Sequence, residues 1–229
     1  DFHEQSLEDL LIMLNEATSE RHFIIYEALR KGADVEEIHN ITHIHRYFIE
    51  QMKEIVLLEE ELLKDKGKKL PDNLLVKAKK NGFSDAYLSV LLDIDESEIR
   101  KQRLDLDIVQ AFEAVPVSGV ENASYYYSSY ASVDKSKASN NKKVMILGGG
   151  PNRIGQGIEF DYCCVHAAFA LKDLGYETIM VNCNPETVST DYDTSDKLYF
   201  EPLTVEDVLA IYEKEKPLGV IVQFGGQTP

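Results

Sequence analysis

The residues best suited to chemistry form a glycine-rich loop, GGGPNRIGQG, at positions 148–157. An apolar run precedes the loop and a helical pattern follows it, which is where backbone N–H groups and a helix N-terminus receive an anion in α/β domains. A dinucleotide-binding fingerprint from Gly148 needs glycine where Arg153 stands, and a Walker A loop from Gly150 needs lysine where Gln156 stands. The glycines would allow a ligand or another backbone to come close, but the loop matches neither phosphate-binding motif. A tight turn that binds no ligand therefore remains the alternative.

A second polar loop, residues 182–196, follows an apolar run that we expect to be a strand. It is crowded with hydrogen-bonding side chains and carries four acidic residues. Direct phosphate binding by such a loop is unfavourable unless a cation lies between the charges. The loop is therefore interpreted as the polar wall of a channel, with turn-forming and capping chemistry as the alternative.

Cysteine and histidine side chains follow the glycine-rich loop on the expected helix. Cys163 lies four residues after Glu159, and His166 four residues after Tyr162, so each pair shares a helix face. A Cys/His metal site needs support from a second cluster at ligand spacing, which the sequence lacks. Cys163 and the adjacent Cys164 are therefore interpreted as small apolar packing residues.

Other candidate residues indicate structure rather than catalysis. The chain has three cysteines, an odd number that fits neither a disulfide framework nor a zinc site and favours a reducing cytosol. His39, His43 and His45 cluster, but helical histidines without carboxylate support seldom hold a metal. Residues 59–61, all glutamate, are interpreted as a solvated face. A Ser-His-Asp triad is not expected, because no Gly-x-Ser-x-Gly elbow is present.

Helical patterns fill the first half of the chain and predict an all-helical domain over residues 1–124. Asp34 is suited to cap one helix, and Gly32 to end the helix before it. Short connections separate the patterns, and no fixed repeat is evident. The expected helices cover 7–14, 20–31, 35–41, 45–65, 73–80, 84–92 and 95–104.

The second half predicts a parallel, doubly wound sheet over residues 142–229. Before it, residues 125–141 form a Tyr-rich strip, expected to lie extended against a domain, and a polar linker. Only three or four strands fit before Pro229, so the domain is expected to be incomplete at its C-terminal end. The expected strands cover 144–147, 178–181, 197–200 and 218–222, and the expected helices 156–174 and 204–214.

Charge and composition restrict the possible partners. The 229 residues carry a net charge of −16, which repels nucleic acid and anionic membranes. No apolar run approaches the ~20 residues of a membrane span. The first residues lack Met, a basic region and an apolar stretch, so we expect no signal peptide, an excised or processed chain, and a cytoplasmic location.

Long segments resemble the carbamoyl-phosphate synthetase large subunit. Residues 148–167, 181–202 and 220–229 resemble the start of its second, carbamoyl-phosphate synthetic half, in the family's order and spacing. ADVEEIHNITHI, KAKKNGFSDAYLS and ESEIRKQR resemble its central oligomerization domain. The resemblance implies a multidomain fold, α then α/β, in which an all-helical oligomerization domain precedes a truncated Rossmann-like pre-ATP-grasp parallel sheet. Residues 107–124 depart from the family, which usually has a Cys-containing connector there.

The resemblance also implies a function for the parent enzyme, an ATP-dependent C–N ligase of arginine and pyrimidine synthesis. That enzyme makes carbamoyl phosphate from bicarbonate, ammonia from glutamine and two ATP, with Mg or Mn and K as ions. The nucleotide- and metal-binding residues are expected in the ATP-grasp domain beyond this chain, which by itself should be inactive and hold no cofactor. The implied partners are the rest of the large subunit, the glutaminase small subunit and a second copy bound through the helical domain; nucleic acid and membranes are not expected.

The same resemblance implies which residues line the second synthetic site and the tunnel that carries unstable intermediates, although no complete catalytic set and no metal ligand are expected here. Carbamate and carboxyphosphate hydrolyse readily, so the enzyme gains by excluding water. Glycines allow the walls to approach closely, and Arg153 suits the charge of an anionic intermediate. The implied lining residues are Arg153, Gly155, Gln156, Gly157, Glu159, Asn184, Glu186, Gly225, Gly226, Gln227 and Thr228.

Two other functional classes remain as alternatives. A small dinucleotide-binding oxidoreductase is disfavoured because position 153 is arginine rather than glycine. A pure interaction module would use the helical part for self-association and leave the α/β part without activity.

Overall fold

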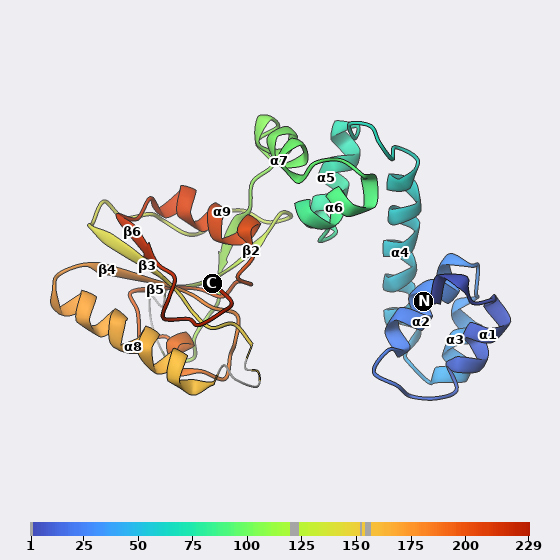
Figure 1. The fold of residues 1–229 in the computed structure, drawn as a ribbon, viewed down its shortest axis with the longest axis horizontal. Coiled ribbons are helices and arrows are strands. Elements are labelled where there is room, and N and C mark those ends of the chain that lie inside the picture. Colours follow the sequence, from blue (N-terminus) through green and yellow to red (C-terminus); the bar gives the residue numbers. More distant parts are fainter. Residues whose placement is uncertain (1, 120–123, 152, 154–156) are drawn as a thin grey trace. The chain divides into compact units, whose positions relative to one another are not determined.

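The computed structural model describes residues 2–119, 124–151, 153 and 157–229. The chain divides into two compact units, Asp1–Gln102 and Arg103–Pro229. Figure 1 shows helices in the first unit and a sheet flanked by helices in the second. Among the helices that the structure describes, none has the length and hydropathy that a bilayer crossing requires.

The helical unit follows the expected pattern closely, because local signals fix its helix ends. The side chains of Ser6, Asp34 and Ser84 each accept a hydrogen bond from a backbone N–H in the first turn of the helix that follows. Gly32 adopts a left-handed φ of 95° just after the second helix. The elements are η1 Phe2–Glu4, α1 Leu7–Met13, α2 Arg21–Arg30, α3 Val35–Thr42, α4 Arg46–Leu63, α5 Asp72–Lys80, α6 Asp85–Leu92 and α7 Glu96–Asp105.

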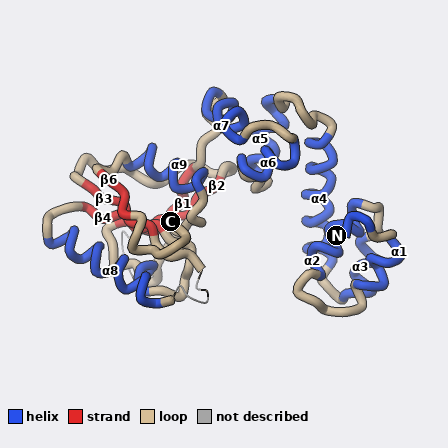
Figure 2. Tube along the Cα trace, viewed as in Figure 1, coloured by secondary structure: helices blue, strands red, loops and turns tan. Residues whose placement is uncertain are grey.

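One hydrophobic cluster of the helical unit joins its first four helices, and the paths of these helices can be followed in Figure 2. Leu10 and Leu14 at the end of α1 are buried against Ile25 of α2, and Ile38 of α3 and Ile49 of α4 complete the cluster. Removing this apolar surface from water stabilises the unit, as do the buried side chains of α5 and α6, among them Leu75, Leu88 and Leu92.

Glu59 corrects the expectation of a solvated glutamate face at 59–61. Its side chain is buried in α4 and accepts hydrogen bonds from the hydroxyls of Tyr26 at 2.5 Å and Tyr87 at 2.8 Å, and from the guanidinium of Arg30. Burial, together with the hydrogen bond to Glu59, raises the pKa of Tyr87 to about 12. The buried carboxylate therefore links α2, α4 and α6, and only Glu60 and Glu61 are exposed.

The α/β unit contains a mixed sheet whose strands lie in the order β1-β2-β5-β4-β3-β6. All neighbouring strands are parallel except β1 and β2, which are antiparallel. The elements are β1 Ala111–Ala114, β2 Tyr125–Ser129, β3 Lys143–Leu147, α8 Ile158–Asp173, β4 Glu177–Val181, η2 Val188–Thr190, β5 Lys197–Tyr199, α9 Val205–Glu215 and β6 Gly219–Ile221.

The two long helices cover opposite faces of this sheet (Figure 1). Met145 and Ile179 point to the face that holds Ile211 of α9. Their neighbours Ile146 and Met180 point to the other face, against α8. This alternation is the two-residue period of a strand, and strands buried on both faces read as continuous apolar runs.

Residues 103–129 differ most from expectation. The Tyr-rich strip is strand β2, in which Tyr125 pairs with Leu198 of β5, and the atypical connector supplies β1. The expectation of an all-parallel sheet is therefore wrong at β1, and the sheet has more strands than expected. The unit begins at Arg103, whereas the sequence predicted boundaries at 124 and 141. β1 has only one buried side chain, Phe112, so it lacks the alternation that predicts a strand.

The polar segment expected to be a linker packs against the sheet. Lys135 N donates to the carbonyl of Phe112 at 2.8 Å, and Lys197 Nζ donates to the carbonyl of Lys137 at 2.8 Å. Lys197 also bonds to the buried carboxylate of Glu215 at 2.9 Å, as does Lys143 at 2.8 Å. Although burial alone raises the pKa of Glu215, these hydrogen bonds hold it below its usual value.

Candidate functional site

Three loops meet at the carboxyl ends of β3, β4 and β6, where ligands gather in open α/β sheets. The glycine-rich loop follows β3, the polar loop 182–196 follows β4, and the loop 222–228 follows β6. A Cβ on Gly225 would lie 2.4 Å from the carbonyl oxygen of Gly148, so these two backbones approach as only glycine permits. The sequence prediction that the glycines serve close backbone approach is confirmed at this position.

The glycine-rich loop is held by a buried amide. Asn182 Oδ1 accepts from Gly150 N at 3.0 Å and from Cys183 N at 2.9 Å. Gly148 N donates to the carbonyl of Val181 at 2.8 Å. The N–H groups of Gly148 and Gly150 are therefore already used within the protein, and they do not form a phosphate cradle of the kind that P-loops present.

Arg153 and Thr228 bring the two glycine loops together at their exposed side. The guanidinium of Arg153 donates to the hydroxyl of Thr228, and the Arg153 side chain is exposed. A Cβ on Gly150 would lie 3.5 Å from Thr228 Cγ2, which shows how closely the loops pack. Gly226 makes the turn with a left-handed φ of 82°, and Gln227 is exposed.

The start of α8 borders the same loops. Gly157 is the N-cap of α8, and Glu159 Oε2 lies 3.0 Å from the position that a Cβ on Gly157 would take. The carboxylate of Glu159 therefore lies at the positive end of its own helix. Gly155 and Gln156, also expected to line the site, lie outside the described residues.

The polar loop after β4 is ordered by its own side chains. Asn184 Oδ1 accepts from Glu186 N at 3.0 Å, and the Asn184 carbonyl accepts from the hydroxyl of Thr190 at 2.9 Å. Asn184 is buried, whereas the Glu186 side chain is exposed. These bonds favour the alternative of turn-forming and capping chemistry for Asn184 and leave Glu186 available at the loop surface.

The cysteines and histidines play no joint role in the described structure. Cys164 is buried, donates to the carbonyl of Leu147 and has a thiol pKa raised by burial to about 12, so its packing role is confirmed. The same interpretation is wrong for Cys163, which is exposed. His39 bonds to the carbonyl of Ile44 at 2.7 Å. Among the described residues, no three His, Cys, Asp or Glu side chains lie together as a metal site.

Glu201 is a titratable group that the sequence analysis did not single out. It follows β5 at the loop-bearing edge of the sheet, is 5% exposed, and accepts a hydrogen bond from Ser128 N. Burial raises the pKa of Glu201 to about 7, with a further contribution from the charge of Asp207. Its hydrogen bond comes from β2, which pairs with β5, and the sequence did not predict β2 as a strand of this sheet.

Comparison with known proteins matches both units. Residues 1–107 match the family described as the carbamoyl-phosphate synthetase large chain, oligomerisation domain, and residues 140–229 match the carbamoyl phosphate synthase preATP-grasp domain. Among similar proteins, the carbamoyl phosphate synthase large chain of Vibrio vulnificus is 56% identical over 219 residues, which cover 94% of this chain and 20% of that protein.

Relatives from other lineages are similar to the same extent. The large chain of Archaeoglobus fulgidus is 52% identical over 99% of this chain and 22% of its own length. The arginine-specific, chloroplastic large chain of Arabidopsis thaliana is 51% identical over 92% of this chain and 18% of its own length. This chain thus spans about a fifth of the length of these relatives. Because two domains of the same large chain match residues 1–107 and 140–229, one in each structural unit, the chain belongs to the carbamoyl phosphate synthase large-chain family.

Proposed function

We propose that this chain is a segment of a glutamine-hydrolysing carbamoyl-phosphate synthetase, an ATP-dependent C–N ligase. The parent enzyme makes carbamoyl phosphate from bicarbonate, ammonia released from glutamine by a small subunit, and two ATP, for arginine and pyrimidine synthesis. The α/β unit forms one wall of the second synthetic site and of the internal tunnel. The helical unit serves assembly.

The observation that carries this proposal is the junction of two glycine loops beside an exposed arginine. Gly225 packs on the backbone of Gly148, which leaves a smooth wall, and Arg153 lies on the exposed side of the junction, bonded to Thr228. Such a wall excludes water from an intermediate that hydrolyses readily. The guanidinium offers a positive charge and directed N–H groups to an anion such as carbamate.

We propose that nucleotide and metal are held by other parts of the parent enzyme. In the parent, ATP with Mg or Mn supplies the phosphoryl group, and K is a further ion. The described part of this chain has no group of three metal-ligating side chains, and the N–H groups of Gly148 and Gly150 bond within the protein. The parent is proposed to work in the cytoplasm, with the ATP-grasp domains and the glutaminase subunit as its partners.

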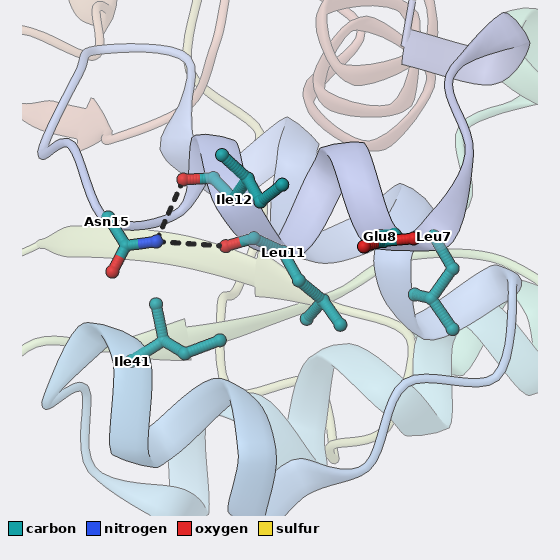
Figure 3. Close-up of a pocket in the computed structure, with 6 residues that line it drawn as sticks. All are labelled: Leu7, Glu8, Leu11, Ile12, Asn15 and Ile41. Atoms are coloured by element: carbon teal, nitrogen blue, oxygen red, sulfur yellow. Dashed lines mark hydrogen bonds between the residues drawn. The ribbon is translucent and has the colours of Figure 1, made fainter.

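Self-association is proposed for the helical unit. An apolar groove runs between α1 and α3, and Figure 3 shows the side chains that line it. Asn15, just after α1, lines the groove and donates to the carbonyl of Ile12 at 2.9 Å. Ile12 is 62% exposed and lies beside other apolar side chains that line this groove, and such a contiguous apolar surface favours a partner there. The groove is lined by Leu7, Glu8, Leu11, Ile12, Asn15 and Ile41.

Arg153 tests the proposed function in the full-length parent enzyme. With Arg153→Ala, we expect carbamoyl phosphate formation to fall by about 10²-fold, as for loss of one charge-stabilising donor, while bicarbonate-dependent ATP hydrolysis is retained. Lys101→Ala, which removes an exposed cation from α7, should change neither rate. Unchanged carbamoyl phosphate formation by Arg153→Ala, or an equal loss of both rates, would contradict the proposal.

A further inference from the structure

The side-chain amide of Asn182 is bonded to two of the loops at the candidate site. The side chain is 1% exposed, and its oxygen accepts the N–H groups of Gly150 and Cys183. An amide oxygen has two lone pairs, so its acceptor capacity is filled. The amide nitrogen donates to Ser189 Oγ at 2.9 Å. One side chain thus connects the loop after β3 with the loop after β4.

The same connection continues to the helix that follows the glycine-rich loop. Ser189 is fully buried, and its N–H donates to both carboxylate oxygens of Asp161, at 3.2 and 3.3 Å. Asp161 lies in the first turn of α8 and is 5% exposed. The segment 182–189 therefore holds the chain at Gly150, before Arg153, and again at Asp161, after it.

Steric contact adds to the hydrogen bonds. A Cβ on Gly148 would lie 2.5 Å from Asn182 Cγ and 2.7 Å from Asn182 Cβ, distances that real side chains do not adopt. Because Gly148 has no side chain, the Asn182 side chain can lie against it, and this position allows the amide to reach the N–H of Gly150. Replacing the amide with a methyl group would leave the buried N–H of Gly150 without its acceptor.

We propose that Asn182 is a positioning residue of the second synthetic site. It holds the chain at Gly150, is linked through Ser189 to Asp161 of α8, and thereby keeps Arg153 beside Thr228. This inference rests on the proposed function for its catalytic consequence. The loop geometry that it describes is tested separately, because hydrogen exchange reports the Gly150 bond whether or not the parent is a synthetase.

Amide hydrogen exchange in the 229-residue chain tests the geometry. Asn182→Ala should speed exchange at Gly150 and Cys183 at least tenfold, while Leu75 in the helical unit keeps its protection. Ser189→Ala removes the acceptor of the Asn182 amide nitrogen, together with a 3.3 Å contact to the Thr187 hydroxyl, but it leaves the acceptor of the Gly150 N–H in place, so it should speed exchange at Gly150 by less. It also serves if Asn182→Ala does not fold. Unchanged protection at Gly150 in the folded variants would overturn the inference.

A double-mutant cycle in the full-length enzyme tests the catalytic consequence. If Asn182 acts through Arg153, Asn182→Ala lowers carbamoyl phosphate formation about tenfold, retains bicarbonate-dependent ATP hydrolysis, and adds no further loss to Arg153→Ala. Tyr192→Phe, an exposed side chain of the same loop, is the matched control. Additive losses would overturn the positioning role. No effect of Arg153→Ala alone would instead overturn the proposed function.

Discussion

The rings of Phe112 and Tyr199 meet edge to face, with centroids 4.9 Å apart and an interplanar angle of 80°. Phe112 belongs to β1 and Tyr199 to β5, two strands that are not neighbours in the sheet. Both side chains are buried, and the ammonium of Lys214 lies 5.7 Å from the Phe112 ring centroid. This aromatic contact therefore packs residues 108–139, the connector between the two family matches, against the core of the α/β unit.

Phe112→Ala should lower the free energy of unfolding of the α/β unit by about 3–5 kcal/mol, because it removes a buried ring and leaves a cavity. Val109→Ala, at a half-exposed position of the same connector, should change it by less than about 0.5 kcal/mol. Urea unfolding followed by tyrosine fluorescence measures both. A loss below about 1 kcal/mol for Phe112→Ala would show that β1 is dispensable to the core.

Glu201→Gln isolates the pH dependence of a buried carboxyl. In the folded chain the pKa of Glu201 is about 7, above its usual value of 4.5. Between about pH 4.5 and 7 the folded chain therefore binds more protons at this carboxyl than the unfolded chain does. The stability from Glu201 is therefore present below pH 4.5 and lost as pH rises through 7. Relative to Glu201→Gln, the wild-type chain should lose about 2–3 kcal/mol between pH 5 and pH 8.

Chemical denaturation at several pH values measures the difference in unfolding free energy between the wild-type chain and Glu201→Gln. The contributions of the other titrating groups cancel in this difference because both proteins contain them. Parallel stability curves for the two proteins would contradict a raised pKa at Glu201.

Gly148→Ala should destabilise the α/β unit by about 1–3 kcal/mol, because the new methyl group overlaps the side chain of Asn182. In an Asn182→Gly background the overlap is removed, so the same substitution should cost less. Gly219→Ala is the matched control, since a Cβ there meets no atom within 4 Å. Thermal unfolding of the four variants checks this cycle, and an equal cost in both backgrounds would exclude the contact.

Ile12→Asp should weaken self-association of the chain at least tenfold, because it places a charge in the apolar groove between α1 and α3. Val90→Asp, at a position 79% exposed in α6 and outside the groove, is the control. Light scattering over a range of concentrations measures the association. A wild-type chain that stays monomeric at every concentration would contradict the assembly role of the helical unit.

Much of the fold was predictable because its signals are local. Asp34 caps α3 and Thr204 caps α9 through their own side chains, and Gly175 follows α8 with a positive φ of 82°. The apolar runs of β3 and β4 are continuous because both faces of those strands are buried. These elements need no information about distant residues.

The remaining features depend on contacts between residues far apart in the sequence. β1 shows a single buried side chain, Phe112, whose partner Tyr199 lies in another strand. The sequence predicts a surface position for Glu59, because its partners Tyr26 and Tyr87 come close only in the folded unit. At the candidate site, the sequence indicated the glycines, but the approach of Gly148 to Asn182 requires the sheet to be assembled first.

The central claim is that this chain supplies a wall of the second synthetic site and no complete phosphoryl-transfer pocket. Release of ADP from MgATP by the isolated chain, measured with and without bicarbonate, tests it most directly. We predict no release above the buffer rate in either condition. Bicarbonate-stimulated release of ADP, retained through purification and abolished by a substitution within this chain, would contradict it.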